Sequence, residues 1–227
     1  NSTVYLNGKE VGGHPYGYTS FFCDATEAIK AGKQNVVAVR VDNSQQKNCR
    51  WYSGSGIYRH VWLIHTPLLH IANHGVHVAT PHVAKDKATV VVTTTVQNEA
   101  AQARQLSVTT RVSDREAVST HVFMQAGETR DIEQQIEIHR PKLWDLATPH
   151  LYTADVTVES DGKVIDEVSQ SFGIRTLKFS TDGFFLNGRT IAINGGCVHH
   201  DNGILGAAAF DRAEERKVRL MKDAGFN

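Results

Sequence analysis

Short runs of strand-forming residues recur between residues 71 and 172, and this repetition constrains the fold more than any other feature of the sequence. Apolar and β-branched residues alternate with polar ones in most runs, as in strands that bury one face. Turn-forming residues separate the runs, among them Asp161-Gly162, a pair that favours a tight hairpin. Seven such runs in about a hundred residues are typical of an immunoglobulin-like β-sandwich. The runs are 71–79, 88–97, 105–112, 119–124, 128–138, 152–159 and 163–172.

The preceding residues also predict β-structure. Val4–Leu6 and Lys9–Val11 flank Asn7-Gly8, a pair that tolerates positive φ at both central positions of a type I′ turn. Pro67 closes this first segment. Further expected elements are strands at 20–24, 35–41 and 61–64, with one helical turn at 26–29.

The pattern changes after Gly173. A short strand is expected at 190–194, followed by a loop over 195–210. A helix follows, with Asp211 as its N-cap, Glu214 completing a capping box and Gly225 just past its end. A strand, a loop, a helix and a second strand at Phe226 are the opening of a βα repeat. The expected domains are therefore residues 1–66, 67–173 and 174–227.

Composition excludes several classes of protein. Lys and Arg together number 24 and Asp and Glu also 24, so the chain lacks the basic surface of a nucleic-acid-binding protein. No apolar run approaches the roughly 18 to 20 residues of a membrane span. Cys23, Cys49 and Cys197 lack metal-binding spacing and are interpreted as buried or half-buried thiols, with a Cys23–Cys49 disulfide left open.

Three motifs, in order along the chain, resemble glycoside hydrolase family 2. The first is Val4–Gly12 with Gly17-Tyr18-Thr19, and the second is Arg50–Arg59 with its Gly-Ile-Tyr-Arg core. The third is Phe172–Thr176 followed by His199-His200-Asp201. The resemblance covers essentially the whole chain and favours a β-galactosidase. Trp144 belongs to a further family motif and is interpreted as structural.

The resemblance implies the fold of each segment. Residues 1–66 would be the C-terminal part of a jelly-roll sugar-binding domain, and 67–173 a complete immunoglobulin-like sandwich. Residues 174–227 would be the first strand, loop and helix of a catalytic (β/α)8 barrel. The fold class is thus mostly β.

The resemblance also places the chemistry of the family outside this chain. Retaining glycosidases use two carboxyl groups about 5 Å apart. The family's acid/base and nucleophile Glu residues would lie beyond Asn227, as would its magnesium ligands. We therefore expect no catalytic residue, no metal or cofactor site, and no hydrolysis by this chain alone.

Substrate-binding residues are expected in two loops. His199, His200 and Asp201 follow the first barrel strand, where barrel enzymes bind substrate, and the resemblance assigns the sugar contact to His199. Incidental loop histidines are the alternative. Arg50, Trp51 and Tyr52 would reach the same sugar from the jelly roll, although some relatives carry an acidic residue in place of Arg50. Packing between domains is the alternative for Trp51 and Tyr52.

Other functions remain open from the sequence. Within the family, a β-glucuronidase or a β-mannosidase fits the same motifs. Outside it, the chain could be a non-catalytic carbohydrate-binding module or an adhesin-like array, but neither needs the βα segment after Gly173. The expected partner is a carbohydrate substrate of the full-length protein, and assembly into a homo-oligomer is left open.

Overall fold

The computed structural model describes residues 1–45 and 54–227. The chain forms two compact units, one made by Asn1–Trp62 with Gly196–Gly225 and the other by Leu63–Gly195 with Phe226–Asn227. The predicted mostly-β class is confirmed. In the described ranges no helix is long and apolar enough to cross a membrane.

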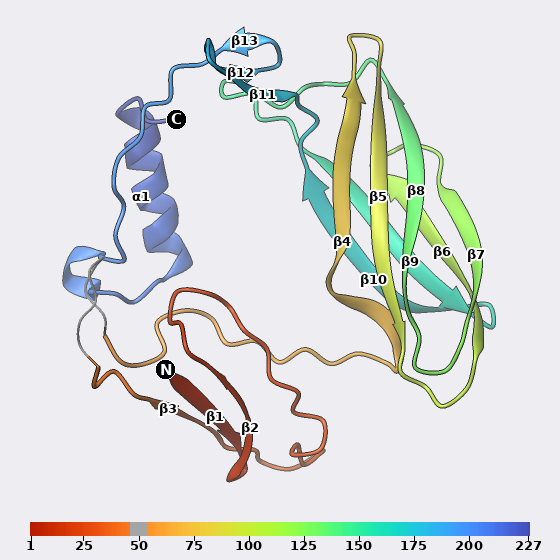
Figure 1. Ribbon diagram of the computed structural model, residues 1–227, viewed down its shortest axis with the longest axis vertical. Coiled ribbons are helices and arrows are strands. Elements are labelled where there is room, and N and C mark those ends of the chain that lie inside the picture. Colours follow the sequence, from red (N-terminus) through yellow and green to blue (C-terminus); the bar gives the residue numbers. More distant parts are fainter. Residues whose placement is uncertain (46–53) are drawn as a thin grey trace. The chain divides into compact units, whose positions relative to one another are not determined.

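Two antiparallel sheets make up most of the second unit (Figure 1). One sheet has the strand order β4-β5-β8 and the other the order β10-β9-β6-β7. All seven predicted runs are strands, with boundaries within a few residues of those expected. The strands are β4 (Leu69–Val83), β5 (Lys87–Asn98), β6 (Arg104–Val112), β7 (Val118–Met124), β8 (Thr129–His139), β9 (Tyr152–Ser160) and β10 (Lys163–Phe172).

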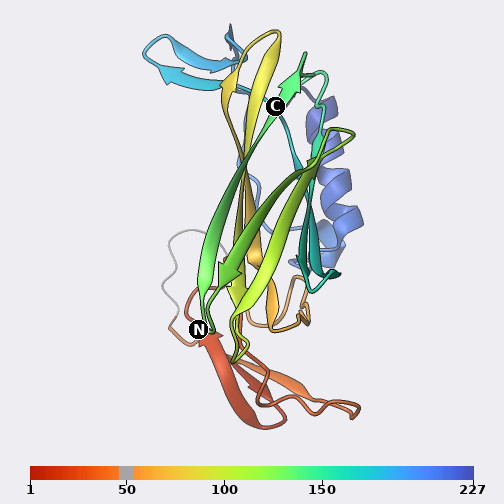
Figure 2. The same ribbon diagram turned by 90° about the vertical axis from the view of Figure 1, so that its right-hand side faces the viewer.

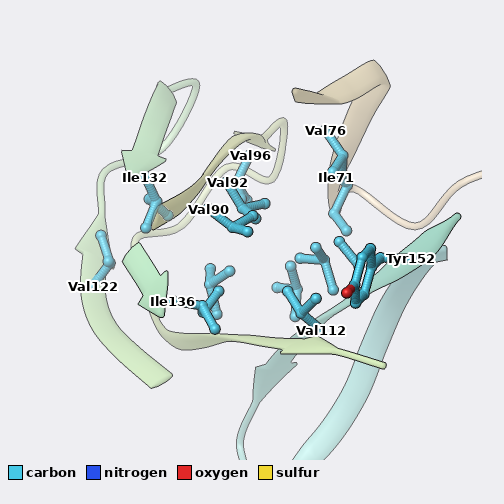
Figure 3. Close-up of a cluster of buried hydrophobic side chains, with 14 of the residues drawn as sticks. Ile71, Val76, Val90, Val92, Val96, Val112, Val122, Ile132, Ile136 and Tyr152 are labelled. Carbon is cyan, nitrogen blue, oxygen red and sulfur yellow. The ribbon is translucent and has the colours of Figure 1, made fainter. Parts of the chain in front are cut away.

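The core of this unit lies between the two sheets. Side chains on β5 and β9 alternate between buried and partly exposed, as the period of two along a strand requires. Val90 and Val92 of β5 and Val156 and Val158 of β9 are completely buried. Figure 3 shows Val90, Val92 and Val96 of β5 in this cluster together with Val112 of β6. This burial is the main source of stability for the unit.

A polar side chain also joins the sheets inside the core. Gln134 of β8 is buried, and its Nε2 donates to the carbonyl oxygens of Val108 and Val118, each at 3.0 Å. Its Oε1 accepts from Thr110 Oγ1 at 2.6 Å. A buried amide is tolerated in an apolar core when its hydrogen-bonding atoms have partners, as they do here.

The end of β10 packs against Trp144. The backbone N–H of Trp144 donates to the carbonyl of Ile174 at 2.8 Å, and the Arg175 guanidinium lies over the indole ring. A Cβ at Gly173 would lie 2.8 Å from the Trp144 Cβ, so this close approach requires glycine. The expected structural role of Trp144 agrees with these contacts.

A small sheet follows, made of β11 (Leu177–Ser180), β12 (Gly183–Leu186) and β13 (Arg189–Thr190), and it lies at one end of the two larger sheets (Figure 2). The strand predicted over 190–194 is shorter than expected, because only its first residue belongs to β13. Residues 192–194 instead meet the chain end: the Asn227 N–H donates to Asn194 O at 3.1 Å, and Asn227 Nδ2 donates to Ala192 O at 2.9 Å. The strand expected at Phe226 is absent from the described chain.

The first unit contains a sheet of order β2-β1-β3, formed by β1 (Ser2–Leu6), β2 (Lys9–His14) and β3 (Val37–Val41). The predicted turn is present, with φ of 54° at Asn7 and 84° at Gly8. The strands predicted at 20–24 and 61–64 are wrong, because neither segment has a ladder partner in the described chain. The expected helical turn is present, since Ile29 N–H donates to Ala25 O at 2.9 Å.

The helix α1 (Asp211–Asp223) belongs to the same unit. Its N-cap is Phe210 rather than the predicted Asp211, and no side chain caps its first turn. Asp211 is therefore the first helical residue, where its negative charge interacts favourably with the positive end of the helix dipole. Gly225 has φ of 89°, as expected of the glycine that ends a helix.

Candidate functional site

The predicted barrel-loop residues lie in the segment 196–210, between β13 and α1. The segment contains one turn of 3-10 helix, η1 (Gly203–Leu205). His199 and Asp201 are exposed, whereas His200 is half-buried. The three neighbouring residues therefore have different surroundings, and the middle one is the least exposed.

His200 packs against two tyrosines of the same unit. Its ring lies parallel to that of Tyr18, with the centroids 5.7 Å apart and an interplanar angle of 8°. The ring of Tyr58 meets it edge-on, at 5.3 Å and 64°. Aromatic pairs at such separations and angles attract one another. Sequence reasoning missed this role of Tyr18 and Tyr58, although both belong to the motifs that carry the family resemblance.

Asp201 stabilises its own turn. The backbone N–H of Gly203 donates to Asp201 Oδ1 at 3.0 Å, and the Asp201 N–H donates to the carbonyl of His199 at 2.8 Å. The first contact is an Asx-turn, which fixes the direction of the carboxylate. Gly203 has φ of 63°, a conformation that suits glycine. The carboxylate of Asp201 is thus both oriented and exposed.

Asn202 connects the loop to α1. Its Nδ2 donates to Glu214 Oε1 at 2.7 Å, and Lys217 Nζ lies 3.1 Å from the other carboxylate oxygen. The pKa of Glu214 is lowered, first by the hydrogen bond from Asn202 and then by the one from Lys217. The sequence assigned Glu214 to a capping box at the start of the helix. The structure instead gives this half-exposed carboxylate a role in holding the loop.

The segment around Tyr58 holds the other end of the loop. The Ala209 N–H donates to the Tyr58 carbonyl at 3.0 Å, and His60 Nε2 lies 2.7 Å from Asp211 Oδ1. The Tyr58 hydroxyl donates to the carbonyl of Gly17 at 2.9 Å. Burial is the first cause of the raised pKa of this hydroxyl, so it is protonated at neutral pH. The Gly-Ile-Tyr-Arg motif is therefore hydrogen-bonded, through Tyr58, to the segment 196–210.

The carboxylates near this loop have structural partners. Asp211 pairs with His60, and Glu215 pairs with Arg212 and Arg219 of its own helix. Residues 1–45 and 54–227 also contain no cluster of His, Cys, Asp and Glu suited to a metal ion.

The remaining sequence-predicted residues are Arg50, Trp51 and Tyr52, and they lie outside the described residues, as does Cys49. Cys23 is half-buried, and burial raises the pKa of its thiol. Cys197 is exposed, contrary to its interpretation as a buried or half-buried thiol.

Comparison with known proteins gives the class to which this fold and loop belong. Residues 69–175, which include the two large sheets, match the model of glycosyl hydrolases family 2. A β-galactosidase of Bacteroides ovatus is 42% identical over 235 residues, covering 100% of this chain and 27% of the relative. A β-glucuronidase of Bacteroides fragilis is 33% identical, covering 99% of this chain and 34% of the relative.

The crystal structure of a family 2 member from Bacteroides cellulosilyticus superposes with a TM-score of 0.94 at 42% identity, over 100% of this chain and 32% of that one. The chain belongs to glycosyl hydrolase family 2. It spans about a quarter to a third of the length of these relatives.

Proposed function

We propose that this chain supplies part of the sugar-binding pocket of a retaining glycoside hydrolase that removes terminal β-linked sugars. The observation that carries the proposal is the exposed pair His199 and Asp201, held in one ordered loop. An imidazole and a carboxylate can each hydrogen-bond a sugar hydroxyl. Contacts of this kind that strengthen in the transition state contribute to glycoside hydrolysis.

The architecture proposed for the chain is that expected from its motifs. Residues 1–66 would be part of a jelly roll, 67–173 an immunoglobulin-like sandwich, and 174–227 the start of a (β/α)8 barrel. Two antiparallel sheets around one core support the sandwich. The hydrogen bonds between Asn227 and residues 192–194 support neighbouring barrel strands. The Arg50–Tyr52 segment would contact the same sugar as His199.

Two substrate classes are proposed, β-galactosides and β-glucuronides, because the relatives carry both names. A saturation-transfer NMR experiment would compare methyl β-galactoside with methyl β-glucuronide. We expect millimolar or weaker binding of one of them, because few polar groups of a pocket converge on this loop. His199→Ala should abolish the transfer signal, whereas His121→Ala, an exposed histidine on β7, should not. Equal signals from all three proteins would overturn the assignment of His199.

We also propose that the chain alone is catalytically inactive. The carboxylates around the candidate loop hold structural ion pairs and hydrogen bonds, which supports this view. The purified chain should release no nitrophenol from nitrophenyl β-galactoside or nitrophenyl β-glucuronide above a buffer control. Turnover that copurifies with the chain and disappears in Asp201→Asn would contradict the proposal. Micromolar sugar binding without turnover would favour a carbohydrate-binding module instead.

A further inference from the structure

We infer that His200 is a positioning residue. Its ring packs against the rings of Tyr18 and Tyr58, a pair called the clasp below, so that His199 and Asp201 face the sugar. This inference rests on the proposed sugar site. It gives the anchoring of the loop to His200, while the sugar contact stays with His199, to which the family resemblance assigns it.

The geometry of the rings carries the first step. The 8° angle with Tyr18 places one face of the imidazole against a phenol ring, while Tyr58 meets the imidazole edge-on. Tyr18 is 39% exposed and Tyr58 half-buried, so the contacts remove part of each ring from water. Such contacts depend on a flat aromatic ring and not on its nitrogen atoms.

Hydrogen bonds hold the tyrosine side of this clasp in place. Tyr58 is fixed from its own side, because its hydroxyl donates to the carbonyl of Gly17, next to Tyr18. The carbonyl of Tyr58 accepts the N–H of Ala209 at the far end of the loop. One tyrosine thus contacts the loop at His200 and again at Ala209. The intervening residues, including the Asx-turn of Asp201, are held between two fixed points.

The anchoring of His200 also affects the side chains on either side of it. His199 and Asp201 flank an anchored residue, and both are exposed while His200 is half-buried. If His200 left the clasp, residues 199–201 would lose the contact that sets their direction. A group must be held within a fraction of an ångström to contribute its full interaction with a ligand.

Two substitutions separate an aromatic anchor from a hydrogen-bonding contact. His200→Phe retains a flat ring and removes both nitrogen atoms, whereas His200→Gln retains hydrogen-bonding groups and removes the ring. Hydrogen exchange of the full 227-residue chain would be followed in residues 197–210. Exchange in β5 and β9 of the other unit is the internal control for folding.

We expect exchange in 197–210 to be about tenfold faster in His200→Gln, as for the loss of one or two ring contacts, and unchanged in His200→Phe. The saturation-transfer signal from methyl β-galactoside or methyl β-glucuronide should follow the same order, with His200→Phe retaining it and His200→Gln losing it.

A sugar signal retained by His200→Gln and lost in His200→Phe would overturn the inference and make His200 a direct contact. Equal loop protection in both variants would also overturn it. If neither sugar gives a signal with the unsubstituted chain, the proposed function fails, while the exchange data still decide whether His200 anchors the loop.

Discussion

Gln134 of β8 is buried and forms several hydrogen bonds to β6 and β7. Replacing it with leucine would keep a similar volume but leave Thr110 Oγ1 and two carbonyls without these partners. Buried groups without partners are costly, so we expect Gln134→Leu to lower the free energy of unfolding by about 3 kcal/mol. Urea denaturation would measure the change.

Gln135→Leu is the matched control for this change, because residue 135 is adjacent on β8 and exposed. It should leave the unfolding midpoint nearly unchanged. Equal midpoints for the two variants would show that the hydrogen bonds of Gln134 add nothing to its packing.

Glu214 should make the loop sensitive to acid. Its folded-state pKa lies below the ordinary value of 4.5, so its hydrogen bond with Asn202 stabilises the loop above that pH. The stabilisation is lost as the pH falls through the lowered folded-state value. The protection factors of amides in 197–210, corrected for the intrinsic pH dependence of exchange, should therefore fall more below pH 4.5 in the unsubstituted chain than in Glu214→Gln, which keeps an acceptor that does not titrate. The same acid response in both proteins would assign it to another carboxylate.

The sequence singled out the residues of the candidate loop but not the ring contacts that His200 makes. His199, His200 and Asp201 were singled out together because they follow a predicted strand. The separate roles proposed for them depend on Tyr18 and Tyr58, which are distant in sequence and carry no local pattern that pairs them with His200. Long-range ring contacts of this kind are set by tertiary structure and were not predictable from spacing.

Strands that pair with a neighbouring strand in the structure were predicted well from the sequence. Two segments predicted as strands, 20–24 and 61–64, have no such pairing. The strands β4 to β10 combine period-two alternation with hairpin turns, and each pairs with a neighbour. Residues 20–24 and 61–64 have the same strand-forming composition, yet Phe22 and Trp62 are exposed and their backbones join no ladder. Strand propensity states only that a residue suits a sheet, and the sheet must also offer an edge.

The junction at the end of β10 should be sensitive to a single methyl group. Gly173→Ala would bring a Cβ to 2.8 Å from the Trp144 Cβ, which cannot rotate away as a distal atom could. We expect the substitution to lower the free energy of unfolding by about 2 kcal/mol, as overpacking usually does. Near-ultraviolet circular dichroism of the indole should change with it.

Gly195→Ala is the control for this junction, because nothing lies within 4 Å of its added Cβ. It should match the unsubstituted chain in both measurements. A Gly173→Ala protein with an unchanged unfolding midpoint would mean that the backbone there shifts without cost.

At the scale of the whole molecule, burial is distributed unequally between the two units. The continuous core of twenty buried apolar residues lies entirely between Leu69 and Ile174. In the described part of the first unit, Leu6 and Ala28 are the buried apolar side chains, and α1 buries none. In that unit Ile204 is fully exposed, and Trp62 is largely exposed. Because apolar burial is the main favourable term in folding, the units should differ in local stability.

Hydrogen exchange of the dilute, monomeric chain should show this difference directly. Amides of β5, β6, β8 and β9 should exchange only by global opening of their unit, because these strands pair on both sides or face the common core. Amides of α1 should exchange through local unfolding, because the helix buries no side chain. On mild warming, their exchange rates should rise before those of the sheet amides. Protection of α1 equal to that of β5 in a verified monomer would show that contacts other than apolar burial stabilise the first unit. In that case the polar contacts of Asn202, Tyr58 and Asp211 would have to hold the helix and loop as firmly as the core holds the sheets.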